Sequence, residues 1–291
     1  MKMKINPVYR QESKVSSRSF RLPLIILLCN SILALAALLD MYFMVTQVRT
    51  TAEIQYSSFL SLYIFAAAIE FVMLLLIVPA LTSGSISGER ERQTLNLLLT
   101  TSMTPGDIVT GKLLASLSTV FVLIVSSFPI LSLVFIYGGV TVKDILILLC
   151  CFSSTAFLAG GIGICCSAVF KRSTIATAAS YCIMVFLVFG TLALSKFMSG
   201  FAGAGRAMKP GSFMVLLLMN PAVSFGVAIK NQTGSIRSIP VLELWAKSPE
   251  TSPLISYWLG ISIGVQLLAA VCCLLIAVRQ VNPRRKRIWK G

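Results

Sequence analysis

The sequence predicts an all-α polytopic membrane protein with six transmembrane helices, and the prediction rests on its composition and its apolar runs. Of 291 residues, 56% are hydrophobic and 12% are charged, with a mean hydropathy of +0.88. A soluble domain carries about 25% charged residues, so most of this chain is expected to lie in lipid. One bilayer crossing needs about 20 apolar residues. Six runs exceed that length, at Leu22–Thr46, Ser57–Leu81, Leu113–Gly138, Ile145–Phe170, Ser173–Leu194 and Leu254–Val278.

The distribution of Lys and Arg predicts how these spans are oriented. Cytoplasmic loops retain basic residues, and most of the 25 Lys and Arg residues fall inside if the N-terminus is cytoplasmic. We expect residues 1–291 to form one transmembrane domain in the plasma membrane of a bacterium, with both termini in the cytoplasm. The first run exceeds the roughly 7–15 apolar residues of a cleaved signal peptide, which favours an uncleaved anchor. The formal charge of +15 then reflects topology and attraction to anionic lipid, and no nucleic-acid partner is expected.

Two features of the composition narrow the chemistry. The chain has no histidine, which removes the most versatile acid–base catalyst and the commonest metal ligand. All eight cysteines fall in predicted spans and none forms a C-x-x-C motif, and a buried free cysteine behaves as a small hydrophobe. We therefore expect no catalytic residue and no metal site.

The two ends of the chain and the segment before the last span are expected to lie outside the hydrocarbon. Residues 1–21 mix apolar and basic side chains, which favours a cytoplasmic interfacial helix over a disordered tail, and residues 279–291 form a basic cytoplasmic tail. The extracellular segment 195–253 contains the apolar stretch Phe213–Ile229, which Asn220–Pro221 interrupts. A re-entrant segment that bends there fits better than a seventh crossing, which would place the basic C-terminal tail outside.

The fourth run carries small residues at a spacing of four. Ala159, Gly163 and Ser167 form one such row, and Ala156 and Gly160 form another. Small residues at this spacing let helix backbones approach closely in lipid. This face is therefore expected to pack on another helix, either within the chain or across a dimer.

The cytoplasmic loop 83–112 ends in a near-match to a phosphate-binding loop. Gly106–Lys112 reads G-D-I-V-T-G-K. A phosphate-binding loop continues with Ser or Thr, whose hydroxyl binds Mg²⁺, but Leu113 stands at that position and opens a membrane span. We therefore expect no nucleotide site in this chain.

A helix start explains the same stretch better. Thr104 can cap the helix, Pro105 suits its first position, and Asp107 favours its positive end. Lys112 then falls in the first turns of the third span, where it is expected at the lipid headgroups.

The upstream part of the loop predicts a short amphipathic helix over Gly88–Thr100. Ser87 can cap it, and Glu89 and Glu91 in its first turn complement the helix dipole. Such a helix either lies on the headgroups or docks on a soluble partner. Its apolar stripe at helical spacing consists of Leu95, Leu98 and Leu99.

The stretch ISGERERQTLNLLLTTSMTPGDIVTGKLLA resembles the loop between the second and third spans of ABC-2 type transporter permeases, where E-R-E-x-x-T-L-x-x-L-L precedes G-K-L-L. The Asn6–Pro7 start, the six runs and the long outer segment are also similar. The resemblance implies a coupling helix that docks on a separate ATPase, with Glu89 to Arg92 as its charged contact. The matching positions are Glu89, Arg90, Glu91, Thr94, Leu95, Leu98, Leu99, Gly111, Lys112 and Leu113.

The resemblance implies that the chain is the permease subunit of an ATP-driven exporter, without an ATPase site of its own and therefore not an enzyme. Two ABC ATPase subunits would hold ATP and Mg²⁺, and a second permease subunit, identical or related, would complete the path. The substrate stays open among lipid, peptide, antibiotic and polysaccharide. A regulatory or sensor subunit on the same scaffold is the alternative.

Two acidic residues lie within predicted spans. A charge in mid-bilayer costs roughly 2.5–3.5 kcal/mol on insertion scales, so it faces protein or water. Glu70 could line a translocation path or form a polar contact between helices, and Asp40 is placed to snorkel outward. If Glu70 carried a proton, the chain would instead be a stand-alone proton-coupled secondary transporter. The lack of histidine and of paired acidic residues within spans argues against an intramembrane enzyme.

Overall fold

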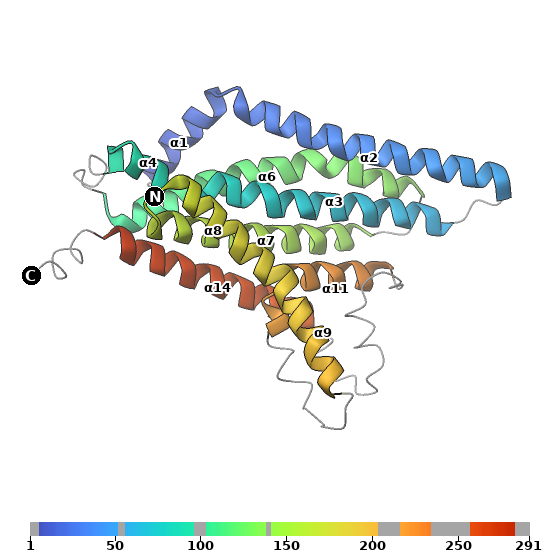
Figure 1. Ribbon diagram of the computed structural model, residues 1–291. Coiled ribbons are helices and arrows are strands. Elements are labelled where there is room, and N and C mark those ends of the chain that lie inside the picture. Colours follow the sequence, from blue (N-terminus) through green and yellow to red (C-terminus); the bar gives the residue numbers. More distant parts are fainter. Residues whose placement is uncertain are drawn as a thin grey trace, which may run out of the picture.

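The computed structural model describes residues 6–51, 56–95, 103–137, 141–202, 216–233 and 257–282, and all regular structure in these ranges is helical (Figure 1). Six helices in this part of the chain are long and apolar enough to cross a membrane, which confirms the predicted number of spans. The elements are α1 (Pro7–Arg18), α2 (Arg21–Thr51), α3 (Tyr56–Ser83), α4 (Ser87–Glu91), α6 (Pro105–Tyr137), α7 (Val142–Val169), α8 (Ser173–Val185), the π-helical turn η1 (Phe186–Gly190), α9 (Thr191–Ala202), α11 (Pro221–Thr233) and α14 (Trp258–Val281).

Two spans extend well beyond the apolar runs that predict them. Helix α6 begins at Pro105 rather than at Leu113, because a capped helix start precedes the apolar run. The helix of the fifth span continues from α8 through η1 into α9 and ends at Ala202, whereas its apolar run ends at Leu194. A prediction from hydropathy alone leaves out such helical ends, because their residues are more polar than those in the middle of the helix.

Helix α7 lies at the centre of the bundle. It packs against α3, α6, α8, α11 and α14, and it is the most buried of the six spans. Helix α2 lies on the outside, against α3 and α6, and α9 diverges from the other helices (Figure 1). One end of the bundle carries α1, α4 and the last turn of α14, and we call it the α4 end. Helix α1 and the C-terminal end of α14 therefore lie at the same end of the bundle.

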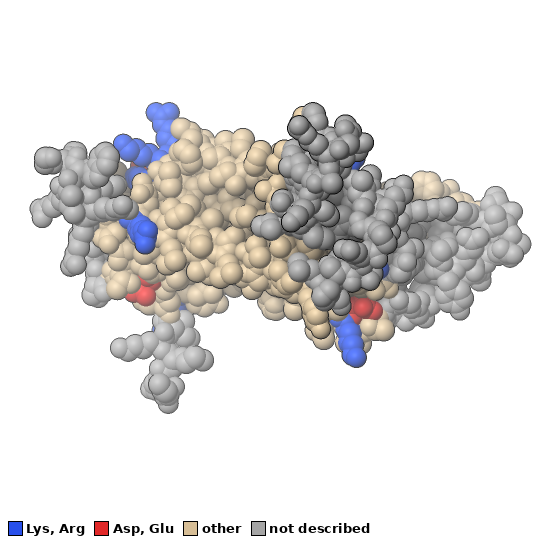
Figure 2. Space-filling view, turned by 90° about the horizontal axis from the view of Figure 1, so that it is seen from below, with Lys and Arg blue, Asp and Glu red and all other residues tan. Residues whose placement is uncertain are grey.

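The surface of the bundle is apolar between its two ends. On the face shown in Figure 2, Lys and Arg side chains lie toward the ends, and the described surface between them is uncharged. Large apolar side chains are exposed along α2, α6, α7, α8 and α14. This pattern suits helices whose middle turns face hydrocarbon.

The small residues of α7 pack against helices of the same chain. A Cβ atom added at Gly163 would overlap Thr82 Oγ1 at the end of α3. A Cβ atom added at Gly161 would lie 3.2 Å from the Cα atom of Ala270 on α14. The glycines thus let α3 and α14 approach α7 closely, and the small-residue face is used within the chain.

A break at Asn220 separates a short helical turn from α11, at the position where the sequence predicts a bend. The Oδ1 atom accepts the N–H of Ala222 at 2.8 Å, which caps α11. The Nδ2 atom donates to the carbonyl of Val188 in η1 at 2.9 Å and to the hydroxyl of Thr191 at 2.7 Å. Asn220 therefore satisfies polar groups at the break and at the π-helical turn, where lipid offers no partner.

Buried polar side chains join α11 to α7 and α14. Gln266 of α14 donates to the hydroxyl of Ser224 on α11 at 2.8 Å and accepts from Ser154 on α7 at 3.3 Å. Ser262 of α14 donates to the carbonyl of Leu218 at 2.6 Å. Such bonds hold helices together in a medium that supplies no hydrophobic driving force between them, so α11 is embedded among the spans.

We predict that Gly163→Ala destabilises the protein. The added Cβ would overlap Thr82 Oγ1, and overpacking a tight contact costs typically about 1–3 kcal/mol. Thermal unfolding of the purified chain in detergent should show a lower Tm. Gly264→Ala on α14 is the matched control, because an added Cβ there meets nothing within 4 Å. An unchanged Tm for Gly163→Ala would contradict the close approach of α3 and α7.

Candidate functional site

The segment after α3 forms the short helix α4 rather than one continuous helix over Gly88–Thr100. Helix α4 spans Ser87–Glu91, and Gln93 then adopts a left-handed backbone with a φ of 61°, a conformation that does not continue a right-handed helix. Thr94 and Leu95 are helical again, and the described part stops there. The prediction of one unbroken amphipathic helix is therefore wrong, because the chain turns at Gln93.

Ser167 of α7 holds the start of α4. Its Oγ atom accepts the N–H groups of Ile86 and Ser87, each at 2.9 Å. The predicted cap by Ser87 is wrong, because this hydroxyl donates to the carbonyl of Ser83 instead. The first N–H groups of a helix have no partner within it, so a side chain from α7 supplies one and fixes α4 to the bundle.

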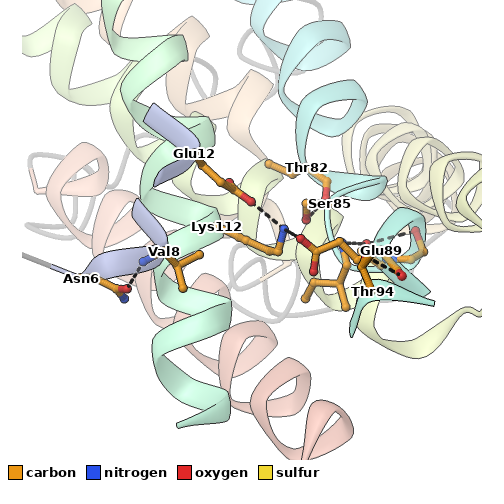
Figure 3. Close-up of polar contacts among 11 residues, drawn as sticks. Asn6, Val8, Glu12, Thr82, Ser85, Glu89, Thr94 and Lys112 are labelled. Carbon is orange, nitrogen blue, oxygen red and sulfur yellow. Dashed lines mark hydrogen bonds and ion pairs between the residues drawn. The ribbon is translucent and has the colours of Figure 1, made fainter. Parts of the chain in front are cut away.

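Lys112 of α6 is buried between two carboxylates (Figure 3). Its Nζ atom lies 2.6 Å from Glu12 Oε1 on α1 and 2.7 Å from Glu89 Oε1 on α4, and its side chain is 3% exposed. The expectation that Lys112 lies at the headgroups is therefore wrong. A buried charge needs pairing, and the two carboxylates provide it.

Arg90 and Glu91 bind the facing ends of α7 and α8. The Arg90 guanidinium donates to carbonyls at the C-terminal end of α7, including that of Ala168 at 3.0 Å. Glu91 accepts the N–H of Ser173 at 2.8 Å and its hydroxyl at 2.7 Å, at the start of α8. Each charge has the sign that the adjacent helix end favours. With Glu89 on Lys112, three of the predicted ATPase-contacting charges thus bind the chain's own helices.

The remaining residues of this segment divide between surface and core. Arg92 and Thr94 are exposed. Leu95 is 6% exposed and packs in an apolar cluster with residues of α6, α7 and α14. The exposed surface of the turn after α4 is therefore polar, and the packing of Leu95 attaches the turn to the bundle. Two further predicted anchor residues lie outside the described part of the chain, Leu98 and Leu99.

The stretch that resembles a phosphate-binding loop forms the start of α6 and the seat of α1. Thr104 donates its N–H to Asp107 Oδ2 at 3.1 Å, and Asp107 donates its N–H to Thr104 Oγ1 at 3.2 Å, which is a reciprocal cap. Asn6 Nδ2 donates to the carbonyl of Asp107 at 2.7 Å. A Cβ atom added at Gly111 would lie 2.9 Å from Val8 Cβ, so the glycine lets α1 approach α6.

Glu70 lies fully buried on α3 and contacts α6. Ser127 donates its hydroxyl to Glu70 Oε1 at 2.5 Å and also lies 2.7 Å from the carbonyl of Ile124. If Glu70 is protonated and donates to Ser127, the Ser127 proton is left for the Ile124 carbonyl, and each contact then has its own donor. Glu70 Oε2 has no hydrogen-bond partner among the described residues. Asp40 lies in α2, and its side chain is outside the described part.

Two residues of the α4 end have partners that the sequence analysis does not anticipate. Glu12 is the acidic residue in an otherwise basic α1, and its isolation among basic residues is the available signal. Ser167 belongs to the row of small residues in α7, where its hydroxyl distinguishes it from the alanines and glycines. Both signals are weak without the fold, because the partners are far away in the sequence.

We predict that Ser167→Ala loosens α4 from α7. Two buried N–H groups would lose their acceptor, and an unsatisfied buried donor costs about 1–3 kcal/mol. Thermal unfolding in detergent should show a lower Tm, and limited proteolysis should cut faster within residues 87–95. Ser118→Ala serves as the control, since that hydroxyl bonds a carbonyl of its own helix. Equal behaviour of the two variants would count against Ser167 as the anchor.

We predict that Glu70→Gln keeps the stability of the wild type, whereas Ser127→Ala lowers it. A glutamine amide can donate to Ser127 as a protonated carboxyl does, so the Tm should stay close to that of the wild type. Removing the Ser127 hydroxyl leaves the buried Glu70 Oε1 without its hydrogen-bond partner and should cost about 1–3 kcal/mol. Thermal unfolding in detergent measures both. Proton uptake into vesicles that is abolished by Glu70→Gln would instead favour the proton-coupled transporter.

Comparison with known proteins finds a family match over most of the chain. The family model of ABC-2 family transporter proteins matches residues 6–277. A search of curated proteins finds no significant match to the chain. The family match runs from the start of α1 almost to the end of α14, and so includes all the candidate spans and the α4 end. This membrane protein therefore belongs to the ABC-2 transporter family.

Proposed function

We propose that the chain is the permease subunit of an ATP-driven exporter and that a separate ABC ATPase docks at the α4 end. Family membership supports the transport role. The observation that carries the proposal is the way α4 and the residue beside it are tied to three spans, through Lys112, Ser167 and Ser173. A force that a cytoplasmic ATPase applies to α4 would be shared by α6, α7 and α8.

The exposed side of this segment is the proposed contact with the ATPase. Arg92, Gln93 and Thr94 are exposed and lie in the turn after α4. Glu89 and Arg90 point to partners within the chain. Glu89 and Arg90 would thus transmit force into the spans, and the exposed Arg92 would receive it from the ATPase.

The charge at the α4 end supports a cytoplasmic location for that end, with both termini and the ATPase on the same side. Cytoplasmic surfaces retain Lys and Arg, and anionic headgroups attract them. The opposite end then faces outward, and Phe213–Ile229 is the re-entrant segment, which bends at Asn220 and continues into α11. Exposed basic side chains of the α4 end come from several elements, at Arg10, Lys14, Arg92, Lys171, Arg172 and Arg279.

The proposed assembly has two permease subunits and two ATPase subunits. The second permease is a copy of this chain or a related one. ATP and Mg²⁺ are held by the ATPase subunits, so the permease contributes the path and the moving spans rather than chemistry. A regulatory or sensor complex on the same scaffold would bind the ATPase in the same way but move no substrate.

The ATPase contact is tested by affinity purification of the full chain from its native membranes. We expect a soluble subunit with a complete G-x-x-x-x-G-K-[ST] motif that hydrolyses ATP. Arg92→Glu reverses an exposed charge and should lower the recovered ATPase about tenfold, with the Tm of the permease unchanged. Lys143→Glu, exposed at the opposite end of the bundle, is the control and should leave recovery unchanged.

Recovery of the permease without any ATP-hydrolysing subunit would overturn the proposal. Equal losses for the two charge reversals would show that net charge, rather than the turn after α4, governs binding. Uptake into vesicles driven by a pH gradient without ATPase would favour the secondary transporter.

A further inference from the structure

We propose that Lys112 is a positioning residue whose ammonium group is shared between α1 and α4, so that loosening one helix tightens the hold on the other. The side chain comes from α6 and bonds Glu12 and Glu89 at the same time. The inference rests on the proposed function only for what displaces α4, since the contact itself involves no ATPase.

Helix α1 is seated on the first turns of α6, beside the shared lysine. Asn6 Nδ2 donates to the carbonyl of Asp107, and Val8 packs where Gly111 has no side chain. Lys112 follows Gly111 directly, so an apolar contact and a charged contact hold α1 at adjacent positions of α6. The distance between α1 and α6 at this point therefore determines whether Glu12 reaches the lysine.

The charge balance of the cluster makes the two ion pairs compete. One positive charge serves two carboxylates at 2.6 and 2.7 Å, so the cluster keeps one net negative charge. The lysine side chain is 3% exposed, while those of Glu12 and Glu89 are 34% and 23% exposed. Water therefore screens the cation poorly, and each carboxylate weakens the field that the other experiences.

Competition gives the coupling a definite sign. If α4 carries Glu89 away, the ammonium is left to Glu12 and holds α1 more firmly against α6. If α1 loosens, Glu89 gains the full charge of the lysine and α4 is held more firmly. Such coupling is reciprocal by thermodynamic necessity. In transport, displacement of α4 by an ATPase would lock α1 onto the third span.

Hydrogen–deuterium exchange of the full chain in lipid nanodiscs tests this inference. Glu12→Gln should slow exchange across residues 87–95 about threefold or more, and Glu89→Gln should do the same across residues 7–18. Lys112→Met should speed exchange in both segments, because two carboxylates then face each other without a cation. Arg10→Gln and Arg92→Gln alter exposed charges nearby and should leave the distant segment unchanged.

The opposite signs of these effects distinguish competition from general destabilisation. Unchanged or faster exchange in the distant segment for Glu12→Gln and Glu89→Gln would overturn the inference. The two conservative variants decide the question even if Lys112→Met does not fold. Because the measurement needs no ATPase, a failed purification of that partner and a failed coupling through Lys112 are separate results.

Discussion

Two N–H groups at the start of α4 share one acceptor, the hydroxyl of Ser167 on α7, and the α4 end is organised around this contact. Helix α4 has five residues, too few to be stable alone, so bonds to other helices must hold it. The end of α3 reaches this position because Gly163, four residues before Ser167, leaves room for Thr82. A close helix approach inside the bundle thus sets the place of a polar element at its edge.

The charged residues of α4 each connect this helix to a different span. Glu89 reaches α6, Arg90 reaches the end of α7, and Glu91 reaches the start of α8. Helix ends leave backbone groups without partners, and near lipid these groups must be satisfied by protein. Arg90 and Glu91, which bind backbone groups at the ends of α7 and α8, therefore also stiffen the connection between these spans. In the proposed function, this stiffness would carry movement of a docked ATPase into the spans.

The spans could be predicted because each is a long apolar run, and the start of α6 could be predicted because Thr104 and Asp107 are three residues apart. The pairing of Lys112 could not, because Glu12 lies 100 residues earlier and only the fold brings them together. The turn at Gln93 was missed for a different reason. A residue other than glycine with a positive φ leaves no local signal when propensity and apolar spacing both favour a helix.

The π-helical turn in the fifth span has a consequence for related sequences. A π-helical turn holds one more residue than the corresponding α-helical turn, and each α-helical residue advances the helix by about 100°. Removing one residue from Phe186–Gly190 would therefore leave an ordinary α-helical turn and would keep α9 on its side of the span. It would also displace the Val188 carbonyl that Asn220 binds. The length of this turn and the residue at position 220 are therefore expected to vary together among homologues.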